Sequence, residues 1–534
     1  MLLVGVLVSN NIFNYIYLLE KGKRMKSRSR KFMLNGMLSF MLQIVTMICG
    51  LILPRMILLR FGSTINGTIS SISQFLGFIT LLQGGVGTVA RYAFYKPLAN
   101  QDFNAISVAY KTVSDFYRKF AVIFIAYMFI LSLIYPIFSH TKLNYWHVSS
   151  LVVIIGFASV FEFFFGQASL NLLFSAQKGY IYSVIQIICI LFSTVISIIL
   201  LKLGCSIQLI KLGGSFMFLI RPIAMYLIVK KWMKLKKDVI PDKSILAQKN
   251  AAFVRHIAFY IHTSTDVMVL TLFSNVLWVS VYTVHYYVTG SLSNLVSSIL
   301  GNTEAVYGDI IAHNDKKELS RSIPIYDLLS KFITCICFFT CMTLISQFIS
   351  IYTANVNDIN YYQPLFAILL VISELIYCMG LTYQNIYIAA GHINKTQWIA
   401  VGEAVINLIV SILLVWKFGI VGVTIGTVLA MIYKSFANII YMKKNVINIS
   451  WHFIIKSYLV NIIPGSILTI LFWTLWYHKI YNFLMFFAYA FFVFCIISAT
   501  TFVLNMVVFR KEVLDLLAIL IKKRKKPILS KRRC

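Results

Sequence analysis

The sequence predicts an all-α polytopic membrane protein with about 14 transmembrane helices. Hydrophobic residues make up 59% of the 534 residues and charged residues only 12%, and the mean hydropathy is +0.82. The apolar residues gather in runs of about 20, which is the length of helix that crosses a hydrocarbon core of ~30 Å. Such runs must be helical, because open strands leave backbone groups unsatisfied in lipid and barrels need an alternating pattern. This composition excludes the soluble globular classes.

The N-terminal region, 1–33, is expected to precede the first membrane helix. Residues 1–20 are apolar but follow no basic stretch, so they make a poor signal peptide and only a marginal span. The segment 21–31 carries seven Lys or Arg residues, as a cytoplasmic stub before a first span commonly does. Met25 is therefore the expected start. The alternative is an additional helix, which would place the two ends of the protein on opposite sides of the membrane.

The apolar runs from residue 34 onward divide the rest of the chain into five regions. The N-lobe, 34–229, contains predicted spans at 34–59, 67–90, 119–138, 148–175, 180–201 and 206–229. A basic cytoplasmic linker, 230–251, leads to the C-lobe, 252–441, with spans at 252–274, 276–300, 331–352, 364–387, 397–417 and 420–441. Region 442–509 holds two more spans, 453–476 and 482–509. The tail, 510–534, is a basic amphipathic stretch expected to lie on the cytoplasmic lipid surface.

The distribution of basic residues supports this set of spans. With the N-terminal stub in the cytoplasm, about 40 of the 48 Lys and Arg residues fall on the cytoplasmic side and about seven on the other. A missed or invented helix would scramble this asymmetry, so both ends are expected in the cytoplasm if Met25 is the start. The net charge of +31 then reflects helix orientation and contact with anionic lipid. No nucleic-acid partner is expected.

The two lobes resemble each other at two places about 215 residues apart. SAQKGYIYSVIQ (175–186) is followed by a span that ends at Gly204, and IAAGHINKTQWIA (388–400) by a span that ends at Gly419. The next span of each lobe carries two glycines, Gly213 and Gly214 in the first lobe and Gly422 and Gly426 in the second. Because the six helices of each lobe have the same orientation, the repeats should be parallel and related by an axis along the membrane normal.

Charged side chains within or near the predicted spans are the candidate functional residues, because each costs about 2.5–3.5 kcal/mol at a helix centre unless it faces water or a partner. Three interpretations stay open: snorkelling near span ends, structural pairs between helices, and a transport cavity. Pro54 and Pro222 stand beside two of these residues, where they would free backbone groups. The deep residues are Glu162, Arg221, Asp266, Glu374 and Glu403, and those nearer span ends are Arg55, Arg91, Arg255 and Lys434.

The sequence carries no motif of a hydrolase, a P-loop enzyme or a metalloprotease. Its nine cysteines lie mostly within the apolar runs and lack the spacing of a zinc site. We therefore expect no catalytic residue, no metal site and no cofactor. A membrane polysaccharide polymerase is an enzymatic alternative, but such an enzyme needs a large external loop, and the longest that we place is 353–363.

Several segments together resemble the Wzx-type polysaccharide flippases of the multidrug/oligosaccharidyl-lipid/polysaccharide exporter superfamily. At the start of the N-lobe these are LNGMLSFMLQIVTMICGLILPRMILLRFGS (34–63), SISQFLGFITLLQGGVG (71–87) and YKPLANQD (95–102). TDVMVLTLFSNVLWVSVYTVHY (265–286), AAGHINKTQ (389–397) and KFGIVGVTIGT (417–427) are similar to second-half segments of that family. Relatives usually carry an acid before Gly-Val-Gly, where this chain has Gln83 and Gly84, so ion coupling through a carboxylate there is not supported.

The resemblance implies two six-helix lobes in a V and the translocation of undecaprenyl-diphosphate-linked repeat units for capsule, exopolysaccharide or O-antigen assembly. It also implies the bacterial cytoplasmic membrane. We expect Arg55, Arg221 and Arg255 to bind the lipid diphosphate, because cationic side chains replace its hydration. Asp266 would bind H⁺ or Na⁺, or pair with an arginine, and Glu374 and Glu403 are further candidates for ion coupling or cavity pairing. The expected partners are membrane lipids and the polymerase machinery, and the expected state is a monomer.

A multidrug or organic-cation antiporter of the same superfamily is the alternative transporter. Such a protein needs an acidic, aromatic cavity to hold a cationic cargo. The whole chain has only 17 Asp and Glu residues against 48 Lys and Arg. This balance favours an anionic cargo.

Overall fold

The computed structural model describes residues 27–522 except 81–85, 140, 142, 234, 237, 247–263, 301–306, 308–309, 312–315, 393 and 476–481. All regular elements in the described residues are helices. The predictions for residues 1–24, for Gln83, Gly84 and Arg255, and for the tail beyond 522 lie outside the described residues.

Ten of the described helices are long and apolar enough to cross a membrane. Two of them, α3 (Ser27–Phe78) and α15 (Gln397–Asn445), contain a break and hold two predicted spans each. Together with α11 (Val276–Leu300) and the shorter apolar helix Ser264–Phe273, these helices fall on the predicted spans, of which 67–90 and 252–274 are described only in part. The predicted all-α polytopic fold is confirmed. Large apolar side chains stay exposed, as lipid contact requires, among them Ile137, Trp416, Leu475, Leu484 and Val507.

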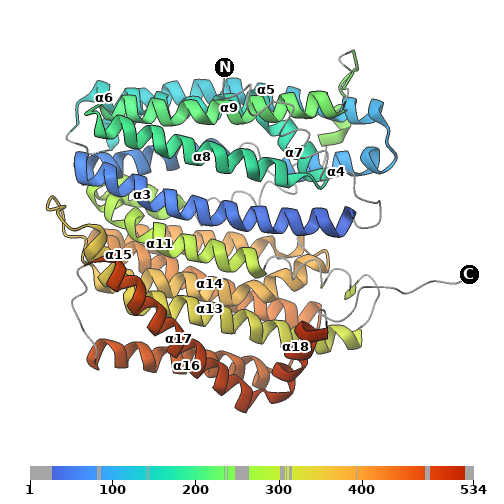
Figure 1. Cartoon of the computed structure of the whole chain (residues 1–534), viewed down its shortest axis with the longest axis vertical. Helices are drawn as coiled ribbons and strands as arrows, with labels where there is room; N and C mark the ends of the chain where they lie inside the picture. The colour runs from blue at the N-terminus through green and yellow to red at the C-terminus, as the bar shows by residue number, and fades with distance from the viewer. Residues whose placement is uncertain are drawn as a thin grey trace, which may run out of the picture. The chain divides into compact units, whose positions relative to one another are not determined.

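The helices of the first half lie alongside one another (Figure 1). After α3 come α4 (Val86–Ala99), α5 (Phe103–Phe138), α6 (Tyr145–Phe161), α7 (Gln167–Ser175), α8 (Gly179–Lys202) and α9 (Ile207–Met233). A π-helical turn, η2 (Glu162–Gly166), joins α6 to α7 within the predicted span 148–175. The predicted span 67–90 holds the end of α3 at Phe78 and the start of α4 at Val86, and its residues 81–85 lie outside the described residues.

Two helices extend well beyond their predicted spans because hydropathy detects only the part within lipid. The helix α5 begins at Phe103, sixteen residues before the predicted span 119–138, and the Asp102 carboxylate caps it by accepting the N–H groups of Asn104 and Ala105. The helix α13 (Lys316–Tyr352) begins before its predicted span 331–352 in the same way. These extensions carry polar residues that belong to continuous helices and not to loops.

The described part of the basic linker is attached to α5. The backbone N–H of Lys236 donates to the hydroxyl of Ser107 (3.1 Å), and that of Asp242 donates to the hydroxyl of Thr112 (2.9 Å). The Asp242 carboxylate accepts hydrogen bonds from the hydroxyl and from the N–H of Ser244. These bonds, the one from the hydroxyl above all, hold the pKa of Asp242 below its usual range. A short 3₁₀ helix, η3 (Lys243–Leu246), follows. The linker therefore has defined contacts of its own.

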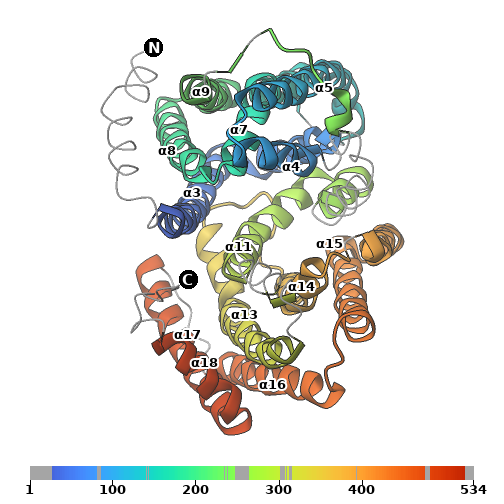
Figure 2. The same ribbon diagram turned by 90° about the vertical axis from the view of Figure 1, so that its right-hand side faces the viewer.

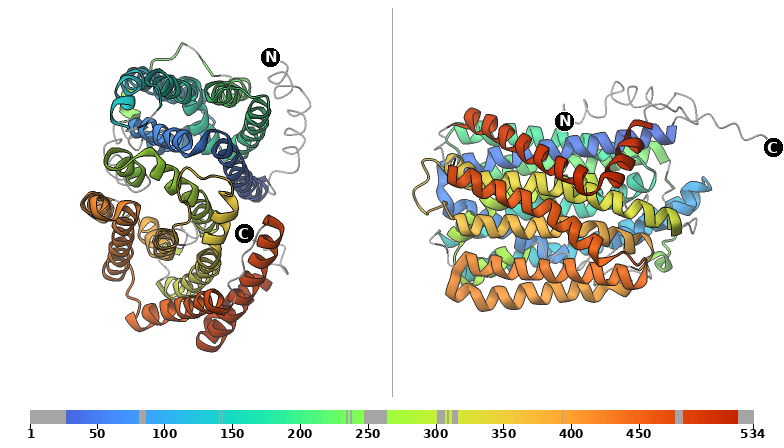
Figure 3. Two further views of the ribbon diagram at one scale, coloured as in Figure 1. Left: turned by 90° about the vertical axis from the view of Figure 1, so that its left-hand side faces the viewer. Right: turned by 90° about the horizontal axis from the view of Figure 1, so that it is seen from below.

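The second half continues with α14 (Pro364–Ala389), η4 (Asn394–Thr396) and α15. The last membrane helices are α16 (Trp451–Leu475) and α17 (Phe483–Val508), followed by the amphipathic α18 (Arg510–Lys522). Both α16 and α17 pack against α13, as the end-on views show (Figures 2 and 3). Gly465 permits one close contact between α16 and α13, because a Cβ at this position would overlap the ring of Phe339.

Contacts divide the chain into two compact units. The first unit comprises Met1–Tyr287, Asn355–Asn360 and Ala404–Gly426, and the second comprises Val288–Ala354, Tyr361–Glu403 and Thr427–Cys534. The units cut across the sequence repeat, so the predicted lobe limits, 34–229 and 252–441, stay a prediction.

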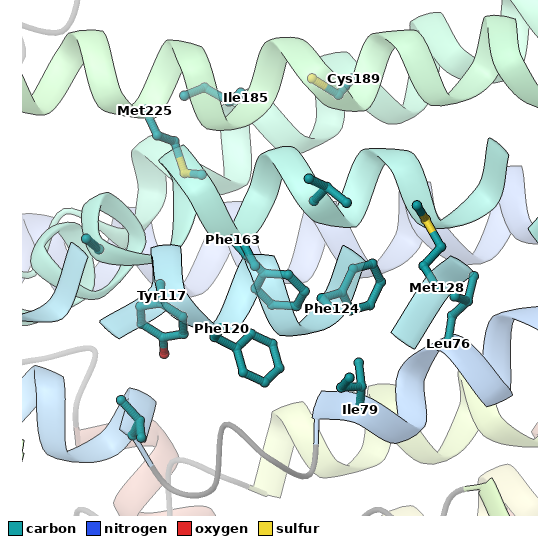
Figure 4. Close-up of a cluster of buried hydrophobic side chains, with 14 of the residues drawn as sticks. Leu76, Ile79, Tyr117, Phe120, Phe124, Met128, Phe163, Ile185, Cys189 and Met225 are labelled. Atoms are coloured by element: carbon teal, nitrogen blue, oxygen red, sulfur yellow. The ribbon is translucent and has the colours of Figure 1, made fainter. Parts of the chain in front are cut away.

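An aromatic cluster forms the centre of the first unit (Figure 4). The ring of Phe163, in the π turn, lies 4.8 Å from that of Phe120 and 5.3 Å from that of Phe124, both on α5. These edge and tilted contacts add to the apolar burial. The cluster fixes the π turn against α5 and thereby positions Glu162, the residue that precedes Phe163.

Backbone conformation supports the internal repeat. Gln177 (φ 57°) and Gly391 (φ 77°) are both left-handed and follow the helices α7 and α14. Gly204 (φ 87°) and Gly419 (φ 54°) also have positive φ, and each ends the next helix of its half. The two pairs are 214 and 215 residues apart, as the sequence similarity predicts.

Candidate functional site

The side chain of Arg221 on α9 joins three helical elements of the first unit. Its Nε and Nη2 donate to Oε2 of Glu162 at 3.1 and 2.9 Å, and its Nη1 donates to Oε1 of Gln186 on α8 at 2.6 Å. The guanidinium also lies 5.6 Å from the ring centre of Phe218. Charge-assisted hydrogen bonds of this kind are the strongest that side chains make.

Local backbone features explain how this pair fits between the helices. The π turn inserts an extra residue at Glu162, and Gly166 leaves the space that the carboxylate occupies, since a Cβ there would lie 2.7 Å from Oε1. On the other side, α9 continues through Pro222, which has no N–H to give to the carbonyl of Phe218. Both helices are therefore irregular where the charged pair sits.

A cavity of about 370 Å³ lies beside the pair. Phe163, Phe218 and Ala158 form its apolar wall. This volume is near the lower end of the range for small-molecule sites, which matches the size of one headgroup. Its polar wall comprises Thr80, Ser159, Glu162, Gln167 and Arg221.

The other predicted arginines do not join Arg221 in the described structure. Arg55 follows Pro54 on α3, is half-buried, and is not among the described residues that line the cavity. Arg255 lies outside the described residues. Arg91 on α4 donates from Nε to Oδ1 of Asn171 (3.3 Å) and lies 4.6 Å from the ring centre of Phe174, so it fastens α4 to α7.

Asp266 belongs to a second polar cluster of the first unit. It is buried, and its carboxylate accepts from the hydroxyl of Tyr282 (2.9 Å) and from the amide of Asn407 (3.4 Å). One turn after Asn407, the hydroxyl of Ser411 donates to the carbonyl of Val423 across the hairpin of α15. Asp266 thus accepts from the hydroxyl of Tyr282 and the amide of Asn407, and Glu162 is a carboxylate that holds Arg221.

The two predicted acids of the second unit are both buried. Glu403 forms an ion pair with Lys434, with Oε2 and Nζ 2.9 Å apart, between the two parts of α15. Gly402 makes room for this arrangement, because a Cβ there would lie 2.7 Å from the ring of Tyr433. Glu374 lies within α14.

The structure also contains a charged cluster that sequence reasoning missed. Lys331 on α13 contacts Oδ2 of Asp327 (2.7 Å), the hydroxyl of Tyr383 (2.9 Å) and that of Ser457 (2.6 Å). Its Nζ also lies 3.9 Å from the ring centre of Tyr458. Asp327 stands before the predicted span and Lys331 at its first residue, so both looked like membrane-surface residues. Their spacing of four residues was the available signal, because it places opposite charges on one helix face.

No group of three or more His, Cys, Asp or Glu side chains that could hold a metal ion occurs in the part of the chain that the structure describes. The described site therefore consists of one charged pair, Arg221 and Glu162, beside a cavity.

Sequence comparison gives no relative: no model of a protein family matches the chain, and no curated protein matches it. Solved structures do match. A structure described as lipid II flippase MurJ in an inward closed conformation has a TM-score of 0.62 at 16% identity, covering 88% of this chain and 98% of that chain. A multidrug resistance MATE family transporter of the MOP superfamily matches in an inward-facing conformation (TM-score 0.56, 14% identity, 75% and 96% covered) and in an outward-facing one (0.51, 14%, 80% and 96%). The chain therefore has the two-lobed helical fold of these transporters.

Proposed function

We propose that this multi-pass membrane protein is a flippase that moves undecaprenyl-diphosphate-linked oligosaccharide repeat units across the bacterial cytoplasmic membrane by alternating access. The proposal combines the transporter fold with the resemblance to Wzx-type flippases. The products would serve capsule, exopolysaccharide or O-antigen synthesis. The chain acts as a transporter and not as an enzyme, embedded in membrane lipids as a monomer and delivering its cargo to the polymerase machinery.

One observation carries this proposal: a permanently charged guanidinium, Arg221, stands at the wall of a headgroup-sized cavity. A diphosphate must exchange its hydration for strong donors when it enters the membrane, and arginine supplies donors in a planar fork that matches phosphate oxygens. Of its five N–H groups, three are given to Glu162 and Gln186. The other two remain for a ligand in the cavity. Arg55 and Arg255 are proposed to complete the diphosphate site.

Ion coupling is assigned to the buried acids. Asp266 is the first candidate for H⁺ or Na⁺, since a buried carboxylate can take up a proton or supply the oxygen ligands that hard cations prefer, and it accepts hydrogen bonds from Tyr282 and Asn407. Glu374 and Glu403 are further candidates. The protein needs no other cofactor for this mechanism.

The charge of the cavity argues against the organic-cation antiporter. A cationic drug requires an acidic wall, and here the one acid among the lining residues, Glu162, is neutralised by Arg221 at 2.9 Å. A polymerase would need catalytic groups on an external loop, and 353–363 is too short to form such a domain.

The test is translocation of the lipid-linked repeat unit in vesicles that contain the purified protein. Arg55, Arg221 and Arg255 are each replaced by Ala and by Lys. We expect the Ala variants to lose transport and the Lys variant of Arg221 to retain part of it, because lysine keeps the charge but not the fork. Full transport by all Ala variants at normal expression contradicts the proposal, and drug resistance in a deletion strain tests the antiporter.

A further inference from the structure

We propose that the second unit carries its own binding site for a phosphate group of the cargo, formed by Lys434 and controlled by Glu403. The inference rests on the function proposed above and adds a binding residue to it. Lys434 would exchange its internal partner, Glu403, for a ligand phosphate.

Lys434 lies two residues before the repeat position of Arg221, which the separation of 215 residues places at Phe436. Arg221 stands eight residues after Gly213 on α9, and Lys434 stands eight residues after Gly426 in the second part of α15. Both glycines mark the close crossing of the last two helices of their repeat. A Cβ on Gly213 would lie 2.6 Å from Leu200, and one on Gly426 would lie 2.9 Å from the backbone N of Ser411. The basic side chains therefore leave equivalent hairpins two turns beyond the crossing.

The two pairs also share their geometry. In each, nitrogen and carboxylate oxygen are 2.9 Å apart, and the acid is more buried than the base. The basic side chains keep 17% exposure for Arg221 and 15% for Lys434. Each cation also lies near an aromatic ring, 5.6 Å from the centre of Phe218 in the first pair and 4.9 Å from that of Tyr377 in the second.

Lys331 shows what a closed pair looks like in the same unit. Its three N–H donors are given to Asp327, Tyr383 and Ser457, and its exposure is 0%. Lys434, in contrast, gives one of its three N–H donors to Glu403 among the described contacts, and its side chain stays partly exposed. A closed pair suits a structural role, whereas an open one leaves donors for a ligand.

The acid sets the affinity of such a site. With Glu403 ionised, the pair is neutral and a phosphate gains little from Lys434. A neutral Gln at this position keeps the shape of the side chain and removes the competing charge. A negative charge within hydrogen-bonding range lowers the binding constant of another anion by a factor of about ten or more. The Glu403→Gln variant should therefore bind phosphate groups at least about tenfold more tightly.

The experiment measures binding of radiolabelled inorganic pyrophosphate to the full chain in phosphatidylcholine nanodiscs by equilibrium dialysis. We expect E403Q to bind more tightly than the unmodified protein, and the double variant E403Q/K434Q to bind one pyrophosphate fewer per chain than E403Q. The double variant removes both charges, so no buried charge is left unpaired and the fold is retained, which thermal unfolding checks. E403Q/K434R should keep the site.

The control is K444Q, which removes an exposed lysine from the same helix and should change neither stoichiometry nor affinity. Equal stoichiometry in E403Q and E403Q/K434Q overturns the inference. Farnesyl diphosphate should compete for the site, whereas phosphatidylglycerol in the nanodisc should not, and loss of pyrophosphate binding in phosphatidylglycerol would assign the site to bilayer lipid and overturn its cargo role. A chain that binds through Lys434 but moves no lipid-linked glycan contradicts the proposed function instead.

Discussion

Lys331 and Asp327, one helical turn apart on α13, form an ion pair that is sealed from solvent, with Nζ and Oδ2 2.7 Å apart. The lysine also holds Ser457 of α16, so the pair fastens the C-terminal helices to α13. Replacing Lys331 by Met leaves a buried carboxylate unpaired and should destabilise the protein by about 3–5 kcal/mol. The double variant K331M/D327L should recover most of this loss, because an apolar pair of similar size replaces a buried ion pair at little cost.

Thermal unfolding in detergent measures both variants of this pair, and vesicle transport measures function. We expect the double variant to transport normally, since the cluster is structural. Loss of transport by a stable double variant would show that Lys331 or Asp327 takes part in the cycle.

The Arg221 pair should separate stability from transport. R221A leaves Glu162 buried without its cation and should cost about 3–5 kcal/mol of stability. The double variant R221A/E162A removes both charges and should regain stability but not transport, because the cavity then has no cation for the diphosphate. Arg118, which pairs with Asp115 on the exposed side of α5, is the matched control. R118A should leave stability nearly unchanged, since exposed pairs contribute about 0–1 kcal/mol.

The sequence was sufficient for the fold because lipid imposes a single simple requirement, about 20 apolar residues per helix. It placed its apolar spans where the described part of the chain has helices. Hydropathy could not show that α5 and α13 extend beyond the lipid, because polar helices and loops look alike on that scale. The π turn at Glu162 also leaves no hydropathy signal, although it decides where the carboxylate lies.

The candidate charges were easier to find than their partners. Sequence identified Arg221, Glu162, Glu403 and Lys434 as intramembrane charges, but the separation of 59 residues between Arg221 and Glu162 gave no reason to pair them. The contacts of Asp266 include Tyr282 and Asn407, and its pairing with an arginine stays a prediction. Long-range contacts depend on helix packing, which the apolar pattern alone does not specify.

Asp266 should determine how transport responds to an ion gradient. In vesicles with an imposed Na⁺ or H⁺ gradient, the unmodified protein should transport faster than without one. D266N keeps the size of the side chain and one accepting oxygen but not the charge, so the gradient should no longer change the rate. D115N, which removes an exposed acid from the same unit, should behave as the unmodified protein does. A D266N variant that keeps the full gradient response would assign coupling to another acid.

Gly62 permits the break in α3. Its backbone (φ 79°, ψ 177°) is in a region that only glycine adopts at low cost, and a Cβ would lie 2.9 Å from Oδ2 of Asp358. The carboxylate of Asp358 accepts hydrogen bonds from the N–H (2.6 Å) and the hydroxyl (2.5 Å) of Ser63. Asp358 thereby caps the part of α3 that follows the break.

G62A should destabilise the protein by about 1–3 kcal/mol, and D358N by about 1 kcal/mol through loss of the charged cap. Thermal unfolding of both variants measures these losses. Unchanged stability of G62A would mean that the break does not need this conformation.

The repeat itself can be tested at Gln177 and Gly391. Both residues are left-handed after equivalent helices, but only the second position has the glycine that tolerates this conformation. A left-handed residue with a side chain costs roughly 1–2 kcal/mol in the folded state, and replacing it by glycine removes this cost. Glycine also gives the unfolded chain more conformational freedom, which offsets part of the gain in stability. Q177G should therefore stabilise the protein by up to about 1 kcal/mol, and G391Q should destabilise it by about the same amount.

A Cβ at Gly391 would meet nothing within 4 Å, so no clash would add to the backbone effect. Chemical denaturation in detergent measures both, with Q101G, at the left-handed residue between α4 and α5, as a third position where glycine should also stabilise. Shifts of the same sign in Q177G and G391Q would show that the two positions are not conformational equivalents.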